Sequence, residues 1–392
     1  MRRKRAQYFF PCFPNPTPQG KSTMPINTLT TEDRVLAVLR GEQPDRVPVF
    51  LYLNPFSDAG FACDPSYSDV MEACRDYEDV IFDWGFPFGF FHTAAELNMT
   101  TRQLSNGDIE HIIETARGEL TSITRADWRG SGTVKRWVTE PEDIERLLSI
   151  PYVPVRPDLS EVLNARATGQ GRWIVQATFS DPIGVVGDID EMSLAIWTIE
   201  QRPLLKRMLE TVFERISEEL AYCLSNGVGP IYYFNGPEYA LPPLMSPDDF
   251  QEFVATYDTR LISQIHEYPG CYTIIHSHGK VSNFLEQFAD TGTDGLNVLE
   301  PPPIGDTVLS DAKRRIGDRV CLIGNIQYDD LARGDDASID QLVREAIAQG
   351  APGGRFILSP CAYPYETPLP AKTAHNMITY LQAGRKYGRY PI

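Results

Sequence analysis

The sequence predicts an α/β protein with a (β/α)8 TIM barrel, and three observations lead to that fold class. The chain has 392 residues, of which 42% are hydrophobic and 23% charged, a composition typical of an ordinary folded protein. Short apolar runs alternate with amphipathic segments, so that one helix follows each strand. About eight such units can be counted, and eight right-handed crossovers favour a closed barrel over an open, doubly wound sheet.

The first elements of the barrel begin near residue 30. Thr31 and two acidic residues precede an apolar stripe that ends before Gly41, which predicts a helix with a favourable N-terminal charge. Residues 46–53 form an apolar run typical of a short buried strand. Two further strands are expected at residues 80–82 and 173–178.

The later elements follow in regular alternation. Strands are expected at residues 231–235, 271–275, 295–299, 320–323 and 355–358. The helices expected between and after them lie at residues 246–266, 281–291, 309–316, 339–348 and 371–383.

Two segments fall outside this alternation. Residues 119–138 alternate with period two around a turn at Gly130, which predicts a β-hairpin inserted near the barrel mouth, the carboxyl end of the strands. Residues 1–24 start with a basic cluster and continue as Pro-rich, polar sequence without the apolar core of a secretory signal. We therefore expect a disordered N-terminal tail over residues 1–24 and one barrel domain over residues 25–392.

Composition argues against several classes of protein. Lys and Arg number 36 against 53 Asp and Glu, a net charge of −17 that disfavours binding to nucleic acid or to anionic lipid. The longest apolar runs reach about seven residues, far short of the roughly 20 that span a bilayer. The seven cysteines include no CxxC pair, which is typical of a reducing compartment, so a cytoplasmic protein is expected.

Residues able to carry chemistry follow the predicted strands, where parallel barrels place their active sites. The loops after the late strands contain Glu238 and Tyr239, His276 and His278, Glu300, Asn325, and Cys361 and Tyr363. Because the ends of parallel strands meet at one face of a barrel, we expect these side chains to surround one cavity.

His276 and His278 lie two residues apart at a strand end, so their side chains face the same side of the sheet. Two imidazoles and the Cys361 thiolate would make an open zinc site, with the fourth position left for substrate. In the alternative interpretation, one histidine is a hydrogen-bonded structural residue and the other a general acid.

Acidic and aromatic side chains near other strand ends extend this picture. Glu238 could complete a metal site or act as an acid or base, or it could be a cap or a salt-bridged loop residue. Asp83 lies among aromatic residues, where burial would desolvate its carboxylate. Trp84 and Phe86 lie in a Gly- and Pro-containing run and could line a pocket, although such runs more often belong to a core. For Glu300 the structural role is favoured.

Several segments together resemble the uroporphyrinogen decarboxylase superfamily, which includes zinc-dependent methyltransferases of the corrinoid and methyl-thiol systems. The segments that carry the resemblance are residues 34–49, 238–247, 276–280, 294–300 and 316–326. The resemblance extends over about residues 30–388 and implies the same (β/α)8 barrel.

The resemblance implies two activities. The decarboxylases carry an arginine-rich loop after the first strand that clamps substrate carboxylates, whereas residues 51–58 contain no arginine; their catalytic aspartate would fall near Asp83. The methyltransferases carry a His-x-Cys ligand pair and a distant Cys. Here the match is His276, then His278 in place of the first Cys, then Cys361. No corrinoid-binding domain is present, so a corrinoid would arrive on a partner protein.

Three hypotheses follow. The first is a zinc-assisted methyl transfer to or from a small substrate by an enzyme that could act as a homodimer, with Asp83, Glu238 and His278 as catalytic residues. Its expected substrate contacts are Trp84, Phe86, Tyr239, Asn325 and Tyr363. The second is a metal-free decarboxylase of a porphyrinogen or a smaller acid. The third is a barrel that binds a tetrapyrrole or corrinoid without turning it over.

Overall fold

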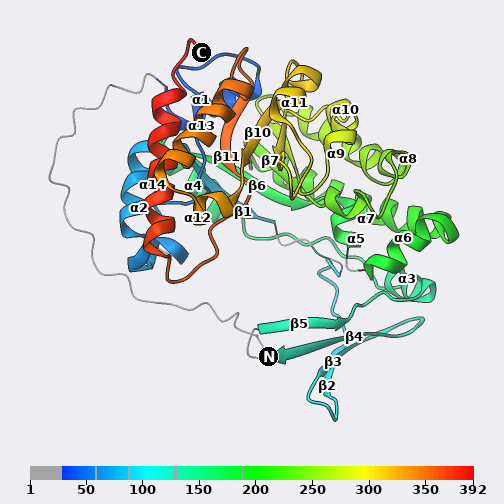
Figure 1. Cartoon of the computed structure of the whole chain (residues 1–392). Helices are drawn as coiled ribbons and strands as arrows, with labels where there is room; N and C mark the ends of the chain where they lie inside the picture. Colours follow the sequence, from blue (N-terminus) through cyan, green and yellow to red (C-terminus); the bar gives the residue numbers. More distant parts are fainter. Residues whose placement is uncertain (1–28, 58–59, 87–88, 90, 128–129, 188) are drawn as a thin grey trace.

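A parallel sheet curled around its own apolar core forms the centre of the molecule (Figure 1). The computed structural model describes residues 29–57, 60–86, 89, 91–127, 130–187 and 189–392. Each strand of the sheet pairs with the next in chain order, through parallel ladders. The strands are β1 (Val80–Gly85), β6 (Trp173–Ser180), β7 (Ile231–Asn235), β8 (Tyr272–Ser277), β9 (Gly295–Val298), β10 (Cys321–Ile326) and β11 (Phe356–Pro360).

The segment at residues 46–53 closes the barrel between β11 and β1. Val49 forms a parallel bridge with Leu358, and the Asp79 amide, just before β1, donates to the Val49 carbonyl at 2.7 Å. On the side of β1, side-chain carboxylates replace further ladder bonds. Asp79 accepts from the Val49 amide at 3.0 Å and Glu78 from the Leu51 amide at 2.8 Å. The predicted eighth strand is therefore in place, although Val49 is its only residue that forms a parallel bridge with the sheet.

Helices surround the sheet as the alternation of the sequence predicts. They are α1 (Thr31–Leu39), α2 (Ser68–Tyr77), α3 (Pro141–Leu148), α4 (Ser160–Gly169), α5 (Pro182–Val186), α6 (Glu191–Glu200), α7 (Arg202–Ser225), α8 (Pro247–Phe250), α9 (Thr256–His266), α10 (Leu285–Asp290), α11 (Leu309–Ile316), α12 (Tyr328–Arg333), α13 (Asp336–Gly350) and α14 (Ala371–Tyr387). The helix expected over residues 246–266 is divided, because a π-helical turn, Gln251–Ala255, separates α8 from α9. No helix in the described ranges is both long and apolar enough to cross a membrane.

Two separate apolar cores hold these layers together. The outer core lies between the strands and the surrounding helices. The inner core fills the barrel, where Val35, Val38 and Leu39 of α1 pack against strand residues such as Ile174 and Ile323. Helix α1 therefore closes the amino end of the barrel with apolar side chains, which leaves the mouth as the open end.

The predicted hairpin over residues 119–138 is one half of a larger insertion. A four-stranded antiparallel sheet consists of β2 (Met99–Gln103), β3 (Ile109–Thr115), β4 (Gly118–Asp127) and β5 (Gly130–Lys135). The strands β2 and β3 were not predicted. Every residue of β2 is exposed and only Ile113 of β3 is buried, so neither has the alternating burial of a typical half-buried strand. This insert sheet follows β1, contacts α3 through β4, and stands apart from the barrel on the side opposite α1 (Figure 1).

Candidate active site

The barrel mouth contains a cavity of about 100 Å³. Four residues expected at the site line it, namely His276, His278, Cys361 and Tyr363. They come from the ends of β8 and β11. Residues two apart on a strand point to the same side, and these side chains point inward. We call this the mouth cavity.

His276 is fixed by a hydrogen-bond network at its Nδ1 atom. Nδ1 lies 2.7 Å from Asn297 Oδ1 and 2.6 Å from the Tyr233 hydroxyl. Asn297 donates its own amide to the Ile323 carbonyl at 3.1 Å, which orients its Oδ1 atom toward the histidine. That oxygen can only accept, so Nδ1 of His276 carries the proton and Nε2 carries a lone pair.

His276 is also neutral at physiological pH. Burial lowers the pKa of His276 to about 4, although the hydrogen bond to Asn297 opposes this effect. A neutral imidazole with a free Nε2 lone pair is the form that accepts a proton or binds a metal ion.

His278 is held in a different electrostatic environment. Its Nδ1 lies 3.1 Å from Glu300 Oε1, while Glu300 Oε2 accepts from the Gly279 amide at 2.7 Å. The hydrogen bond to Glu300 raises the pKa of His278 and outweighs the opposing effect of burial. The two imidazole rings meet edge to face, with centroids 4.6 Å apart. The mouth therefore combines a neutral imidazole with one that favours the protonated form.

Cys361 places a thiol in the same cavity. Its side chain is 2% exposed, and Sγ donates to the Val298 carbonyl at 3.9 Å. Burial raises the pKa of the Cys361 thiol well above its ordinary value, with a further contribution from the charge of Glu300. As the structure stands, the thiol is neutral.

The donor chemistry of these three residues suits zinc, but they are not assembled as a metal centre. Histidines that bind metal ions usually donate their other ring nitrogen to an oxygen acceptor. Asn297 and Glu300 supply such acceptors, so Nε2 of both His276 and His278 is available. Within the described part of the chain, no three His, Cys, Asp or Glu side chains lie close enough together to hold a metal ion.

The two predicted acids do not line the mouth cavity. Glu238 follows β7 directly, its Oε2 atom has no hydrogen-bond partner among the described residues, and burial raises the pKa of its carboxyl group. Asp83 is exposed, so the expectation of a desolvated carboxylate is wrong. It accepts hydrogen bonds from Gln176 Nε2 at 3.0 Å and from the Thr178 hydroxyl.

Two aromatic residues expected to contact substrate belong to the outer core instead. Trp84 and Phe86 are 8% and 6% exposed, and the ring of Phe86 stacks on Phe179 with centroids 4.8 Å apart. The alternation of β1 explains the difference, because Asp83 faces the barrel interior and Trp84 therefore faces the helices.

Tyr239 and Asn325 also lie outside the mouth cavity. The Tyr239 ring packs on α5 and its end, where a Cβ atom built on Gly187 would lie 2.6 Å from it. Asn325 is half-buried near the end of β10, in register with Ser359 of β11.

Sequence reasoning missed the three other polar side chains that line the mouth cavity, Tyr52, Tyr233 and Asn297. They lie within or beside apolar runs, so they looked like ordinary strand residues. The signal that could have identified them is the period of two that places Tyr233 and Asn297 on the inward side of their strands. Tyr52 also adopts a left-handed backbone conformation, with φ 61°, which favours a functional or turn position.

Comparison with known proteins agrees with this architecture. Residues 183–379, half of the chain, match the family model described as uroporphyrinogen decarboxylase (URO-D). The chain belongs to the uroporphyrinogen decarboxylase family.

Two individual proteins show the range of this similarity. The uroporphyrinogen decarboxylase of Chromohalobacter salexigens is 31% identical over 118 residues, which span 29% of this chain and 32% of that protein. The match thus covers about a third of the length of that relative. A methyltransferase from Methanosarcina mazei superposes with a TM-score of 0.58 over 92% of this chain and 99% of its own, at 19% identity. The similarity to the methyltransferase shows a shared fold.

Proposed function

We propose that this protein is an enzyme that transfers a methyl group to or from a small substrate with the help of a zinc ion. The observation that carries the proposal is the arrangement of the two histidines. Both Nδ1 atoms are occupied by oxygen acceptors, so both Nε2 atoms remain available in a cavity that also contains the Cys361 thiol.

In this proposal His276, His278 and Cys361 hold the metal. A bound zinc ion would lower the pKa of an acceptor thiol or polarise the methyl donor. The chain itself fixes the donors: Asn297 and Tyr233 orient His276, and Glu300 orients His278. Cys361 must lose its proton to act as a ligand, so binding of zinc would release a proton.

The lining of the mouth cavity supports a small substrate without many carboxylates. Among the described residues that line it, none is Lys or Arg. A volume of about 100 Å³ holds only a few non-hydrogen atoms, well below the roughly 300 Å³ at which drug-sized pockets begin. A methyl donor larger than this, such as a corrinoid, would have to approach from outside on a partner protein.

Metal analysis of matched variants tests the proposal. The wild-type protein should carry about one zinc per chain, whereas His276→Ala and Cys361→Ser should lose it and retain their circular dichroism spectra. His375→Ala is the control, because that histidine is exposed on α14 and pairs with Asp336 at 2.7 Å. Equal zinc contents in all four proteins, or a metal-free wild-type protein that still transfers methyl groups, would contradict the proposal.

A metal-free decarboxylase is the second candidate, and one observation favours it. The raised pKa of His278, caused by Glu300, keeps a cation available to bind a substrate carboxylate or to protonate a carbanion. Asp83 lies close enough for its charge to act on Tyr363 of the mouth cavity. This candidate predicts carbon dioxide release by chelator-treated protein, which His278→Gln abolishes and Cys361→Ser leaves intact. A protein with neither activity would be a binding barrel.

A further inference from the structure

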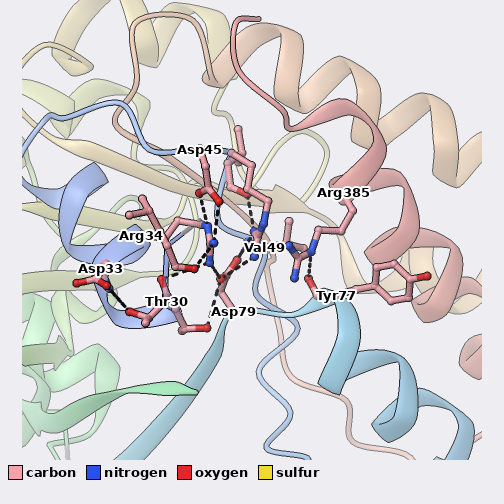
Figure 2. A network of polar contacts seen from close by, with 12 residues as sticks. Thr30, Asp33, Arg34, Asp45, Val49, Tyr77, Asp79 and Arg385 are labelled. Atoms are coloured by element: carbon pink, nitrogen blue, oxygen red, sulfur yellow. Dashed lines mark hydrogen bonds and ion pairs between the residues drawn. The ribbon is translucent and has the colours of Figure 1, made fainter. Parts of the chain in front are cut away.

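A second cavity lies at the amino end of the barrel, opposite the mouth. Its volume is about 190 Å³, and Val80 at the start of β1 and Gly171 just before β6 are among its lining residues. Five arginines line it, namely Arg34, Arg46, Arg75, Arg172 and Arg385. We call it the arginine cavity, and Figure 2 shows the polar network beside it.

Two of these arginines are paired with acids. Arg34 binds Asp79 and Asp45, each at 2.7 Å. Arg46 shares Asp79 with it. Burial alone would raise the pKa of Asp79. The charges of Arg46 and Arg34 instead lower this pKa to about 2, so the carboxylate is ionised at neutral pH.

The other three arginines donate to backbone carbonyl groups, which carry no net charge. Arg75 donates to the Pro55 carbonyl at 3.1 Å, and Arg172 to the Gly169 carbonyl at 3.2 Å. Arg385 donates to the carbonyls of Tyr77 and Asp76, at 2.8 and 3.0 Å. Asp45 and Asp79 pair with Arg34 and Arg46, so Arg75 and Arg172 add positive charge that these two acids do not neutralise.

Two buried polar atoms in the lining of the cavity lack a hydrogen-bond partner. Arg46 is 4% exposed and Glu78 is 5% exposed, and neither Arg46 Nε nor Glu78 Oε2 has a hydrogen-bond partner among the described residues. Burial raises the pKa of Glu78 to about 8, so its carboxyl group is mostly protonated at neutral pH and can donate. Buried polar atoms rarely stay unpaired, so the Arg46 Nε–H group, with the Glu78 oxygen beside it, indicates that a polar ligand belongs in this lining.

The grouping of guanidinium groups around one space also favours an anion there. Burial, together with the positive charge of Arg46, lowers the pKa of Arg385 to about 10. The N-terminal residues cannot provide the counter-charge, because residues 1–28 contain five basic residues and no Asp or Glu.

We propose that the arginine cavity binds a phosphate group, either as inorganic phosphate or on a small phosphorylated molecule. Guanidinium groups from separate segments, α1, the closing segment, α2, α14 and the loop before β6, surround one space. A tetrahedral oxyanion offers acceptors in several directions at once, and planar guanidinium groups bind such oxygens in pairs. This site is independent of the chemistry proposed for the mouth cavity.

Calorimetry at constant ionic strength tests the proposal, with inorganic phosphate and glycerol phosphate as probes and chloride as the reference. The informative variant is the double substitution Arg75→Gln and Arg172→Gln, because both side chains are exposed at the cavity rim and their loss should not disturb the core. Arg319→Gln is the matched control, since it removes one exposed arginine that pairs with Asp290 and does not line the cavity.

We expect saturable phosphate binding by the wild-type protein and the control, and at least tenfold weaker binding by the double variant. Tighter binding of glycerol phosphate than of inorganic phosphate would identify a phosphorylated molecule as the ligand, and the reverse would identify the free ion. Arg172→Lys, which keeps the charge but loses the planar fork, should bind with intermediate affinity. The proposal would be overturned if the wild-type protein bound no phosphate, as expected of a cavity filled only with water. It would also be overturned if the double variant bound phosphate as tightly as the wild-type protein.

Discussion

Glu78 and Asp79 are adjacent buried acids whose pKa values are shifted in opposite directions. Glu78, surrounded by the amides of the closing segment, has a pKa raised by burial to about 8, whereas Asp79, between two arginines, has a pKa lowered to about 2. Two carboxyl groups that are neighbours in the sequence therefore differ in charge at neutral pH. The sequence alone could not reveal this difference, because the arginines come from residues 34 and 46.

Glu78 should make the protein less stable as the pH rises. An unfolded glutamate ionises near pH 4.3, so between about pH 4.3 and 8 the unfolded state binds fewer protons, and stability falls by roughly 1 kcal/mol per pH unit. Glu78→Gln should remove this contribution. Urea denaturation from pH 5 to 8 should show a flatter dependence for the variant than for the wild type. Glu142→Gln, at an exposed site on α3, should keep the wild-type slope; equal slopes in all three proteins would contradict the prediction.

His278 should lose basicity when its partner carboxylate is neutralised. The carboxylate of Glu300 favours the imidazolium, so Glu300→Gln should lower the pKa of His278. Titration of the histidine ring protons by NMR measures this directly. Asp294→Asn is the control, because it should lower the pKa of His266, which Asp294 raises, and leave His278 unchanged. An identical pKa of His278 in the wild-type protein and in the Glu300→Gln variant would refute the assigned pair.

At the level of elements, the alternation of apolar runs and amphipathic segments predicted the strands and most of their helices. It located the closing segment at residues 46–53 but could not show that two carboxylates replace its ladder bonds, because those acids lie about 30 residues further along the chain. It also placed His276, His278 and Cys361 at one mouth. It failed for Trp84 and Phe86, because a continuous aromatic run does not show which residues face outward.

The insert sheet depends on its buried residues. Met99 and Ile113 are cross-strand partners, yet Ile113 is fully buried and Met99 is 49% exposed. Ile113→Ala should therefore lower the free energy of unfolding by about 2–5 kcal/mol. Met99→Ala should change it by less than about 0.5 kcal/mol. Urea denaturation of both variants makes the comparison, and similar losses would show that the sheet does not pack as described.

For the whole molecule, the barrel and its buried cores extend over the described residues, while the tail at residues 1–24 lies outside them. Its sequence has little apolar periodicity to join a core, so its removal should shift the melting temperature by no more than about 2 °C. Thermal denaturation of protein that begins at residue 25 measures the effect. A drop of many degrees would show that these residues contribute to the folded barrel.

The closing segment connects the two ends of the molecule. Arg46 lines the arginine cavity and Tyr52 lines the mouth cavity, and the extended chain between them spans about 20 Å at the usual rise of a strand. Helix α1 fills the barrel floor, which separates the two cavities from each other as compartments. The backbone of residues 46–52 therefore runs along the barrel wall from one cavity to the other, held by β11 on one side and by Glu78 and Asp79 on the other.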